Sequence, residues 1–433
     1  MKIKFINARL LTLTEDVKIS FGELEVTDRR ISYVGPARSK SDNYDRVIDC
    51  QGNLLMPGFK NAHTHSAMTF LRSYADDDDL HTWLTEKVFP LEANLQPGDE
   101  YHLAKIAFLE YLTSGVTACF DMYYNPLSTA AASHDIGFRT VCLGTVTKFK
   151  ESVAEMVEAY HTINQPESIV SYRLGFHALY TANPDILLEL AKAAKELKTP
   201  IFTHIAETRK EISDSYATYG MSPVQYFEKI GLFDYGGGGF HCIYLNDEDI
   251  EIFKKRHLYV VTNPSSNIKL ASGIAPLAKY VEAGIPIAIG TDGPASNNAL
   301  DFFREMFLVT SLSKIAADDP RVVDAYQVLK MATINGADAL GLHDARTLAI
   351  GQLADIIMLD LEQPNMQPLN NIVKNIVYSG SKSNVIMTMI DGKILYEKGQ
   401  FYVGEDVHQI YQKAQEITDR IKLAATKTQI NNG

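Results

Sequence analysis

Short apolar runs alternate with amphipathic stretches through the middle of the chain. Eight of these runs have the length of buried strands, and helical patterns such as residues 97–113 and 184–197 separate them. The runs lie at 54–65, 116–122, 138–146, 172–179, 200–206, 239–244, 258–263 and 285–291. This alternation predicts an α/β fold, a parallel (β/α)₈ TIM-type barrel over residues 57–350, with its chemistry at the C-terminal strand ends. An open doubly wound sheet is the alternative, but no glycine-rich nucleotide loop follows any of these strands.

Both ends of the chain show a different, strand-rich pattern. Residues 1–56 contain short alternating runs broken by turns, and residues 351–404 return to that pattern, with Asp391-Gly392 suited to a two-residue hairpin. Two β-rich ends around a different middle predict one discontinuous domain. Residues 405–433 follow as a helix and tail, because apolar residues recur at helical spacing over 405–427 without Gly or Pro.

Two segments within the barrel region are unusual. The connection from His65 to Pro97 is much longer than an ordinary strand-to-helix loop, which is typical of a lid or binding loop. It contains the acidic run Asp76–Asp79, which we expect to be a solvated turn, and the single tryptophan, Trp83. The glycine run at 236–239 does not open a helix, so we expect a flexible turn before the sixth strand, not a phosphate loop.

Charge and cysteine content exclude several classes of protein. The 433 residues include 41 basic and 53 acidic side chains, and the net charge of -12 repels nucleic acid. Cys50, Cys119, Cys142 and Cys242 form no C-x-x-C pair, which favours a reducing cytoplasm over a disulfide framework or a thiolate zinc site. No signal-like or membrane-spanning apolar segment is present, so we expect neither secretion nor a membrane partner.

Histidines gather at the C-terminal ends of the predicted strands. Five of the twelve fall there: His63, His65, His177, His204 and His241. Residues two apart on a strand point to the same face, so His63 and His65 both project into the barrel mouth, where they can share a cation. An H-x-H pair alone is a weak indication, because it often arises by chance.

Two carboxylates extend this pattern. Asp292 ends the apolar run at 285–289, where burying an unpaired carboxylate would be costly and a metal ion would remove the cost. An N-cap of a following helix is the alternative role for Asp292. Together with His63, His65 and His204, it predicts a site for Zn²⁺ or a related divalent metal. Glu207 lies three residues beyond His204, where it could exchange protons with an activated water; the alternative is a solvated Glu at a helix start.

Several motifs together resemble the amidohydrolase superfamily. They are PGFKNAHTH at 57–65, HIAET at 204–208, HC at 241–242 and GTDG at 290–293. The resemblance covers nearly the whole chain and implies that the two chain ends form a composite β-sandwich, with GQLAD at 351–355 typical of its C-terminal part. Two-metal members carry a bridging lysine on the fourth barrel strand. No lysine occurs from Ser171 to Thr181, which points to the one-metal deaminase branch.

Within that branch, the chain is similar to the 5′-methylthioadenosine/S-adenosylhomocysteine deaminases. The matching stretches are HSAMTFLRSYADD at 65–77, WL at 83–84, PLE at 90–92 and SNIKLASG at 266–273. The resemblance implies that Trp83, Glu92 and His177 contact the nucleoside, with Glu92 on the ribose hydroxyls. Chemically, Trp83 offers a stacking face for a purine and Glu92 an acceptor pair for a diol. Lid packing and a surface charge are the alternative interpretations of Trp83 and Glu92.

One departure from that family bears on the 5′ substituent. Members that bind the homocysteine carboxylate use an arginine beyond the third barrel strand, where this chain has GTV at 144–146. Arg139 lies at the beginning of that strand, and Lys148 or Lys150 lacks the bidentate fork of arginine. We therefore expect 5′-methylthioadenosine or adenosine as substrate, with S-adenosylhomocysteine less suited.

The resulting prediction is a cytoplasmic hydrolase with one divalent metal per chain, Zn²⁺ or else Fe²⁺, that deaminates adenine nucleosides to the inosine analogue and ammonia. The resemblance implies that Glu207 delivers a proton to the purine ring nitrogen, that Asp292 takes a proton from the water, and that His241 orients this water.

Two alternatives to this function remain. A related one-metal hydrolase of guanine, cytosine or a triazine would use the same ligands, and Trp83 and Glu92 argue against it. A barrel without catalysis, serving in assembly, would typically have lost metal ligands, whereas all four are present here. The substrate is expected to be a small molecule, and the sequence leaves a homo-oligomer open.

Overall fold

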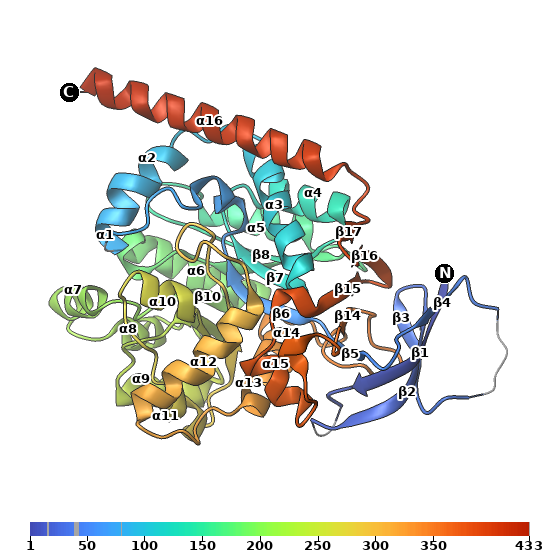
Figure 1. Ribbon diagram of the computed structural model, residues 1–433. Coiled ribbons are helices and arrows are strands. Elements are labelled where there is room, and N and C mark those ends of the chain that lie inside the picture. Colours follow the sequence, from blue (N-terminus) through green and yellow to red (C-terminus); the bar gives the residue numbers. More distant parts are fainter. Residues whose placement is uncertain (15–16, 39–42, 79, 433) are drawn as a thin grey trace.

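The computed structural model describes residues 1–432 except 15–16, 39–42 and 79, and it confirms the predicted barrel. Eight parallel strands follow one another in chain order (Figure 1). They are β6 (Phe59–Thr64), β7 (Val116–Met122), β8 (Arg139–Leu143), β9 (Val170–Gly175), β10 (Ile201–Ile205), β11 (Gly237–His241), β12 (Tyr259–Thr262) and β13 (Ile287–Ile289). The first and last strands meet where the N–H groups of Thr291 and Asp292 donate to the His63 carbonyl, at 3.1 and 3.0 Å.

Helices cover the outside of the barrel. They are α3 (Asp99–Thr113), α4 (Pro126–Ile136), α5 (Val153–Ile163), α6 (Pro184–Leu197), α7 (Arg209–Tyr219), α8 (Pro223–Lys229), α9 (Asp247–Arg256), α10 (Pro264–Lys269), α11 (Leu277–Glu282), α12 (Phe302–Ala317), α13 (Ala325–Ala332) and α14 (Ile334–Leu340). The predicted helices at 97–113 and 184–197 are α3 and α6. Helix α6 begins where it should, because the Asn183 side chain accepts the Ile186 N–H and Pro184 occupies the first turn.

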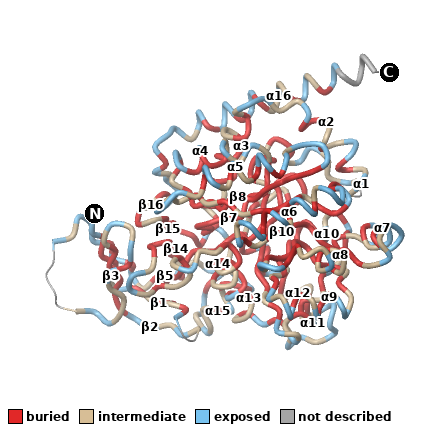
Figure 2. The backbone as a smooth tube through the Cα atoms, turned by 180° about the vertical axis from the view of Figure 1, so that it is seen from behind, coloured by how far each residue is buried: buried red, intermediate tan, exposed pale blue. Residues whose placement is uncertain are grey.

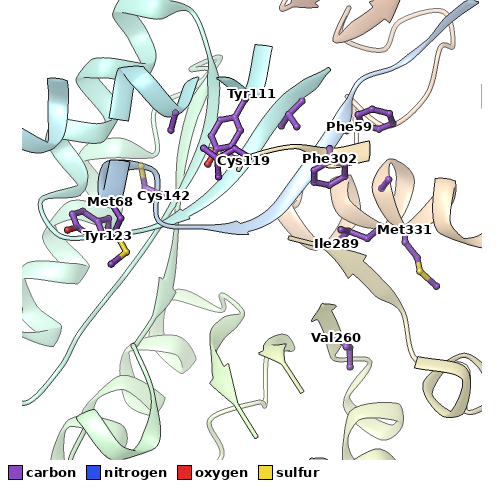
Figure 3. Close-up of a cluster of buried hydrophobic side chains, with 14 of the residues drawn as sticks. Phe59, Met68, Tyr111, Cys119, Tyr123, Cys142, Val260, Ile289, Phe302 and Met331 are labelled. Carbon is purple, nitrogen blue, oxygen red and sulfur yellow. The ribbon is translucent and has the colours of Figure 1, made fainter. Parts of the chain in front are cut away.

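The hydrophobic core lies in two shells around the strands. Figure 2 shows the buried chain concentrated at the barrel strands and exposed chain on the outer helices. Outside the sheet, the Phe59 ring stacks on Phe302 with centroids 5.5 Å apart (Figure 3). Inside the barrel, Phe240 belongs to the interior cluster and stacks on the His63 ring at 3.8 Å. The packed interior therefore forms the floor on which the predicted site rests.

The two chain ends form one mixed sheet beside the barrel. Its described strands are β1 (Lys2–Leu11), β2 (Ile19–Thr27), β3 (Arg30–Gly35), β4 (Arg46–Asp49), β5 (Leu54–Pro57), β14 (Ile356–Leu359), β15 (Val385–Ile390), β16 (Lys393–Glu397) and β17 (Gln400–Phe401). Strand β5 pairs antiparallel with β14, with Met56 opposite Ile357. The predicted two-residue turn is present: Asp391 and Gly392 have φ of 54° and 75°.

A buried ion-pair cluster joins this sheet to the bottom of the barrel. The Arg139 guanidinium, at the start of β8, donates to both Asp355 oxygens at 2.7 and 3.0 Å and to Asp391 at 3.2 Å. Removing one partner of such a buried pair typically costs about 3–5 kcal/mol. Because Arg139 is fully engaged at the opposite end of its strand, it cannot reach a substrate at the barrel mouth.

The C-terminal residues form the predicted helix. Helix α16 (Val407–Asn432) runs along the outside of the barrel beside α3 (Figure 1). Its periodic apolar residues Ile410, Ala414, Ile417 and Ile421 are buried, as the spacing predicts. Another short helix, α15 (Ile372–Tyr378), packs against α12 and α13. Among the described residues, no helix combines the length and apolar character needed to cross a membrane.

The glycine run at 236–239 corrects an expectation. Three of its residues lie within strand β11 instead of forming a turn before it. A Cβ on Gly237 would stand 1.8 Å from the Ile201 carbonyl oxygen, and Gly237 has φ of 132°. Gly237 is therefore required by the close approach of β10 and β11, and the expected flexible turn is wrong.

The long connection after β6 folds over the barrel mouth. It contains the 3₁₀ helix η1 (Ser66–Leu71), α1 (Leu80–Thr82), the π-helix η2 (Trp83–Val88) and α2 (Phe89–Glu92). Asp76 does not lie in a solvated turn as expected, because it accepts hydrogen bonds from Lys269, the last residue of α10, and from Asn298 in a later loop. Asp79 lies outside the described residues. This pairing ties the connection to the far side of the mouth.

Candidate active site

Four predicted ligands converge at the C-terminal end of the barrel. The ligand atoms of His63, His65, His204 and Asp292 all lie within 4.8 Å of one another. His63 belongs to β6 and His204 to β10, while His65 and Asp292 follow β6 and β13 directly. Parallel strands end at the same rim of a barrel, which is why residues more than 200 positions apart meet here.

Hydrogen bonds to backbone carbonyls orient two of the imidazoles. His65 Nδ1 lies 2.5 Å from the Met122 carbonyl, and His204 Nδ1 lies 2.7 Å from the His177 carbonyl. Each bond makes Nδ1 the N–H and turns a lone pair of Nε2 toward the cluster, the arrangement common among metal-ligating histidines. His65 Nε2 is 3.1 Å from Asp292 Oδ1.

The protonation states of His63 and Asp292 suit a cation. His63 is fully buried, both of its ring nitrogens lack a hydrogen-bond partner, and burial lowers its pKa to about 3. Although burial opposes it, the imidazoles of His63 and His65 beside the carboxylate hold the pKa of Asp292 well below its usual range. Neutral imidazole and ionised carboxylate are the forms that bind metal. The unpartnered nitrogens of His63 and this donor set fit a divalent metal.

Serine hydroxyls hold the Asp292 carboxylate in place. Ser266 and Ser296 donate to Oδ2 at 2.6 and 3.0 Å, and the Gly293 N–H donates to Oδ1 at 2.9 Å. No described helix begins at Asp292, so the alternative role as an N-cap is wrong. Neither serine is a predicted site residue, because Ser266 lies on α10, 26 residues from Asp292, and the spacing of four residues between Asp292 and Ser296 is not itself a sequence signal.

Glu207 and His241 lie beside the four ligands. His241 Nε2 is 3.8 Å from Glu207 Oε2 and 3.9 Å from Asp292 Oδ2. His241 Nδ1 lies 2.6 Å from Asn267 Oδ1, so Nδ1 is the N–H and Nε2 faces the site. Ser272 donates to Glu207 at 3.3 Å. Glu207 is buried, and burial raises its pKa, so the alternative of a solvated helix-start Glu is wrong.

The turns that carry these residues are conformationally strained. Ala206, His241, Cys242 and Asp292 all have positive φ, between 50° and 69°. Non-glycine residues in this region cost of order 1–3 kcal/mol each and persist where the surroundings impose them, commonly at functional sites.

The predicted nucleoside-contacting residues line the same cavity as the ligands. Trp83, Glu92 and His177 border it together with His65, Glu207 and Asp292. Trp83 donates its Nε1–H to the Ala75 carbonyl at 3.0 Å, and the Tyr123 hydroxyl donates to Glu92 at 2.7 Å. Glu92 is 5% exposed, and burial raises its pKa, so it is not the surface charge of the alternative interpretation.

A side cavity of ≈ 250 Å³ adjoins the main one and shares Glu92 and His177 with it. The surface that lines it is mostly apolar. The described lining residues are Phe89, Ala93, Tyr124, Thr147, Phe149, Lys150 and Thr181 besides the two shared ones, and they include no arginine. The Lys150 ammonium lies 4.3 Å from the Tyr124 ring centroid, whereas Lys148 lies over Phe149, outside this lining.

The barrel, its strand-end ligand cluster and the composite sheet define a metal-dependent hydrolase of the amidohydrolase type. The amidohydrolase family model matches residues 54–395. The chain therefore belongs to the amidohydrolase family, and the predicted resemblance is confirmed. Together with the His/His/His/Asp cluster, this membership indicates a divalent metal cofactor.

Particular relatives narrow the comparison. The chain is 41% identical to a 5-methylthioadenosine/S-adenosylhomocysteine deaminase of Moorella thermoacetica, covering 88% of this chain and 91% of the relative. It is 40% identical to the deaminase of the same name in Syntrophomonas wolfei, covering 93% and 95%.

Solved structures agree on the fold. An adenosine deaminase from Xanthomonas campestris with bound zinc superposes with a TM-score of 0.91 at 29% identity, covering 98% of each chain. A guanine deaminase from C. acetobutylicum, with a TM-score of 0.80 at 19% identity, covers 91% of this chain and 100% of its own. At that identity, the second similarity shows the fold alone.

Proposed function

We propose that this enzyme hydrolytically deaminates adenine nucleosides, giving the inosine analogue and ammonia. The observation that carries the proposal is that Glu92, a buried carboxylate suited to a ribose diol, lines the same cavity as the four-residue ligand cluster. The relatives named as nucleoside deaminases support it.

The chain's own residues divide the chemistry as follows. His63, His65, His204 and Asp292 would hold the metal, proposed to be Zn²⁺, with Fe²⁺ compatible with the same donors. When bound, the metal supplies Lewis-acid activation, which lowers the pKa of the attacking water toward about 7.

Proton transfer is assigned to the neighbouring groups. Asp292 takes a proton from the water, and His241 Nε2, fixed by Asn267, orients that water for attack on the ring carbon that bears the amino group. Glu207 delivers a proton to the adjacent ring nitrogen, which makes the carbon open to attack by the water. The proton that Asp292 took then passes to the amino group, which leaves as ammonia, while the new hydroxyl returns a proton to Glu207 and becomes the carbonyl. Burial raises the pKa of Glu207 and so favours the protonated form that this delivery needs.

Substrate recognition is assigned to the cavity wall. Trp83 packs on the purine, His177 contacts the nucleoside, and Glu92 accepts from the 2′- and 3′-hydroxyls of the ribose. The 5′ substituent would then enter the side cavity, which shares Glu92 with the main one. Because this cavity is mostly apolar and Lys150 is the single cation among its described lining residues, we propose 5′-methylthioadenosine or adenosine ahead of S-adenosylhomocysteine.

A substrate panel tests the proposal. Adenosine, 5′-methylthioadenosine, S-adenosylhomocysteine, guanine and cytosine are incubated with the metal-loaded enzyme, and the absorbance change and ammonia release are measured. The two small nucleosides should react fastest. Faster reaction of guanine or cytosine would instead support the related heteroaromatic hydrolase.

The four buried, unpaired cysteines are consistent with the proposed cytoplasmic location.

A further inference from the structure

Glu211 makes an unusual contact at the start of helix α7. Its position three residues after the N-cap Thr208 is that of a capping box, in which the Glu side chain bonds back to the N-cap N–H. The Glu211 carboxylate instead accepts the N–H groups of Ala206 at 3.0 Å and of Glu207 at 2.9 Å. It therefore holds the two peptide units on either side of Ala206, directly before Glu207, and not the helix end.

Helix α5 of the same chain shows the ordinary arrangement. There, Glu155 occupies the same helical position and accepts the N–H of its own N-cap, Ser152, at 2.8 Å. Glu155 stands at the surface, whereas Glu211 is only 6% exposed. A capping role alone would place the Glu211 carboxylate on the N–H of its N-cap Thr208, as Glu155 does in α5.

The turn that Glu211 holds is strained and is fixed from the other side too. Ala206 has φ of 54°, a conformation that costs a non-glycine residue of order 1–3 kcal/mol. Its carbonyl accepts the N–H groups of Ile243 and Tyr244, both at 3.0 Å, from the segment directly after His241. Residue 206 therefore connects the turn that carries Glu207 to the turn that carries His241.

Burying this carboxylate is costly. Desolvation raises the pKa of Glu211 to about 7, and the hydrogen bonds from the Ala206 and Glu207 backbones act against that rise. Among the described residues, no lysine or arginine forms an ion pair with it. Two hydrogen bonds from backbone N–H groups stabilise the fold little once the free energy of desolvating the carboxylate is subtracted. This small net gain favours a role in placing the two N–H groups.

We propose that Glu211 is a positioning residue that fixes the Glu207 carboxylate relative to His241 and Asp292. This inference rests on the proposed role of Glu207 in proton transfer. Glu211 itself does not line the main cavity, so it acts through the backbone of residues 206 and 207.

The test is the Glu211→Gln variant. Glutamine keeps the shape of the side chain, but its amide nitrogen cannot accept, so one of the two N–H groups loses its partner. We expect kcat for 5′-methylthioadenosine to fall about 10- to 10²-fold, as for a misplacement of about 1 Å, with KM and metal content nearly unchanged. Amide hydrogen exchange at residues 206 and 207 should become faster, a readout that does not depend on activity.

A double-mutant cycle separates positioning from general stability. In the Glu207→Gln background, the Glu211→Gln change should cost less than about twofold in kcat, because the group that it positions is already missing. Asp249→Asn is the matched control. Asp249 is a fully buried carboxylate at the same position of helix α9, where it accepts its own N-cap Asn246 N–H at 3.0 Å. That variant should lose stability but keep kcat.

Several outcomes would overturn the positioning role. The role is overturned if Glu211→Gln lowers kcat equally in the wild-type and Glu207→Gln backgrounds. It is also overturned if amide hydrogen exchange at residues 206 and 207 is unchanged in the variant. If Glu211→Gln fails to fold, Glu211→Asp replaces it, because the shorter carboxylate keeps its charge but cannot span both N–H groups. A wild-type enzyme inactive on every nucleoside would instead reject the proposed function, while the exchange measurement would still test the positioning.

Discussion

The Tyr123 hydroxyl donates a hydrogen bond of 2.7 Å to the Glu92 carboxylate, and both groups are buried in the wall of the main cavity. Tyr123 comes directly after β7 and Glu92 ends α2, so the bond joins the barrel rim to the long connection above it. It holds an acceptor over the cavity before any substrate arrives, which lowers the entropy cost of binding a diol.

Glu92 should therefore determine the preference of the enzyme for nucleosides over free bases. A site built to hydrogen-bond a substrate hydroxyl penalises analogues without it by up to about 10⁴–10⁵-fold in kcat/KM. Adenosine should be much better than 2′-deoxyadenosine or adenine, and Glu92→Ala should narrow the gap mainly by slowing adenosine. Steady-state kinetics on the three compounds checks this. Equal slowing of adenosine and adenine would reject the assignment of Glu92 to the ribose.

Phe149 should affect only the recognition of the 5′ substituent. It lines the side cavity next to Lys150, so Phe149→Ala removes apolar surface from the site proposed for the methylthio group. Loss of about 1 kcal/mol of burial corresponds to about a fivefold drop in kcat/KM for 5′-methylthioadenosine. Adenosine, which lacks this group, is the internal control and should be nearly unaffected. A parallel drop for adenosine would place the 5′ group elsewhere.

Metal content should be about one divalent ion per chain. Four ligand atoms converge on one point, and His204→Ala removes one of them. Elemental analysis of the purified protein should find one equivalent in the wild type and a large loss in this variant, with activity lost in parallel. Two fully occupied metals, or active wild type without metal, would contradict the assignment.

Glu207→Gln should separate proton transfer from metal binding. The substitution keeps size and shape but removes the basic carboxylate, so kcat should fall by about 10²–10⁴-fold. Metal content should stay at the wild-type value, because Glu207 is not one of the four converging ligands. If the variant kept more than about a tenth of wild-type kcat, Glu207 would not be the proton-transfer group.

Glu305 should make stability depend on pH. It is fully buried on α12, accepts the Ser265 N–H and an Asn297 N–H, and burial raises its pKa to about 7. The folded state then binds more protons than the unfolded state between about pH 4.5 and 7. This contribution to the free energy of unfolding is therefore full below pH 4.5 and is lost as pH rises through 7.

Glu305→Gln should abolish that contribution. From pH 4.5 to pH 8 the wild type should lose up to about 3 kcal/mol of unfolding free energy that the variant keeps, because burial raises the pKa of Glu305 from about 4.5 to about 7. Denaturant unfolding of both proteins at the two pH values measures the difference. If the difference in unfolding free energy between the wild type and the variant were the same at both pH values, Glu305 would not be the protonated group in the folded state.

The sequence predicts the barrel well because its evidence is local. Each strand is an apolar run, and each ligand stands at the end of one, so His63 and Asp292 can be placed without knowing how the loops fold. The hydrogen bond from His241 to Asn267 spans 26 residues, and that from Ser266 to Asp292 also spans 26. Such pairs depend on loop conformation, which no periodicity encodes.

The wrong predictions also arise from contacts between residues that are distant in the sequence. The glycine run at 236–239 is expected to form a turn because glycine favours turns, whereas Gly237 and Gly238 lie in β11, where tight contacts with the neighbouring strands, a tertiary feature, leave no room for a Cβ. Asp76 was expected in water because acidic runs are usually solvated, yet Lys269, 193 residues away, pairs with it. Glu211 follows Thr208 at capping-box spacing, and only the structure shows which N–H groups it accepts.

The pairing of β5 with β14 has a consequence for synthesis of the chain. Met56 and Ile357 are partners, so β5 leaves the ribosome about 300 residues before its neighbour exists. At about 5–20 residues per second, that delay is roughly 15 to 60 s. During this time β5, paired with β1 on one side, has an unpaired edge on the other, and Arg139 has not yet met Asp355. The nascent chain therefore carries an unpaired strand edge, the kind of edge that favours aggregation, for most of its translation, and β14 covers this edge only when the final fifth of the chain is made.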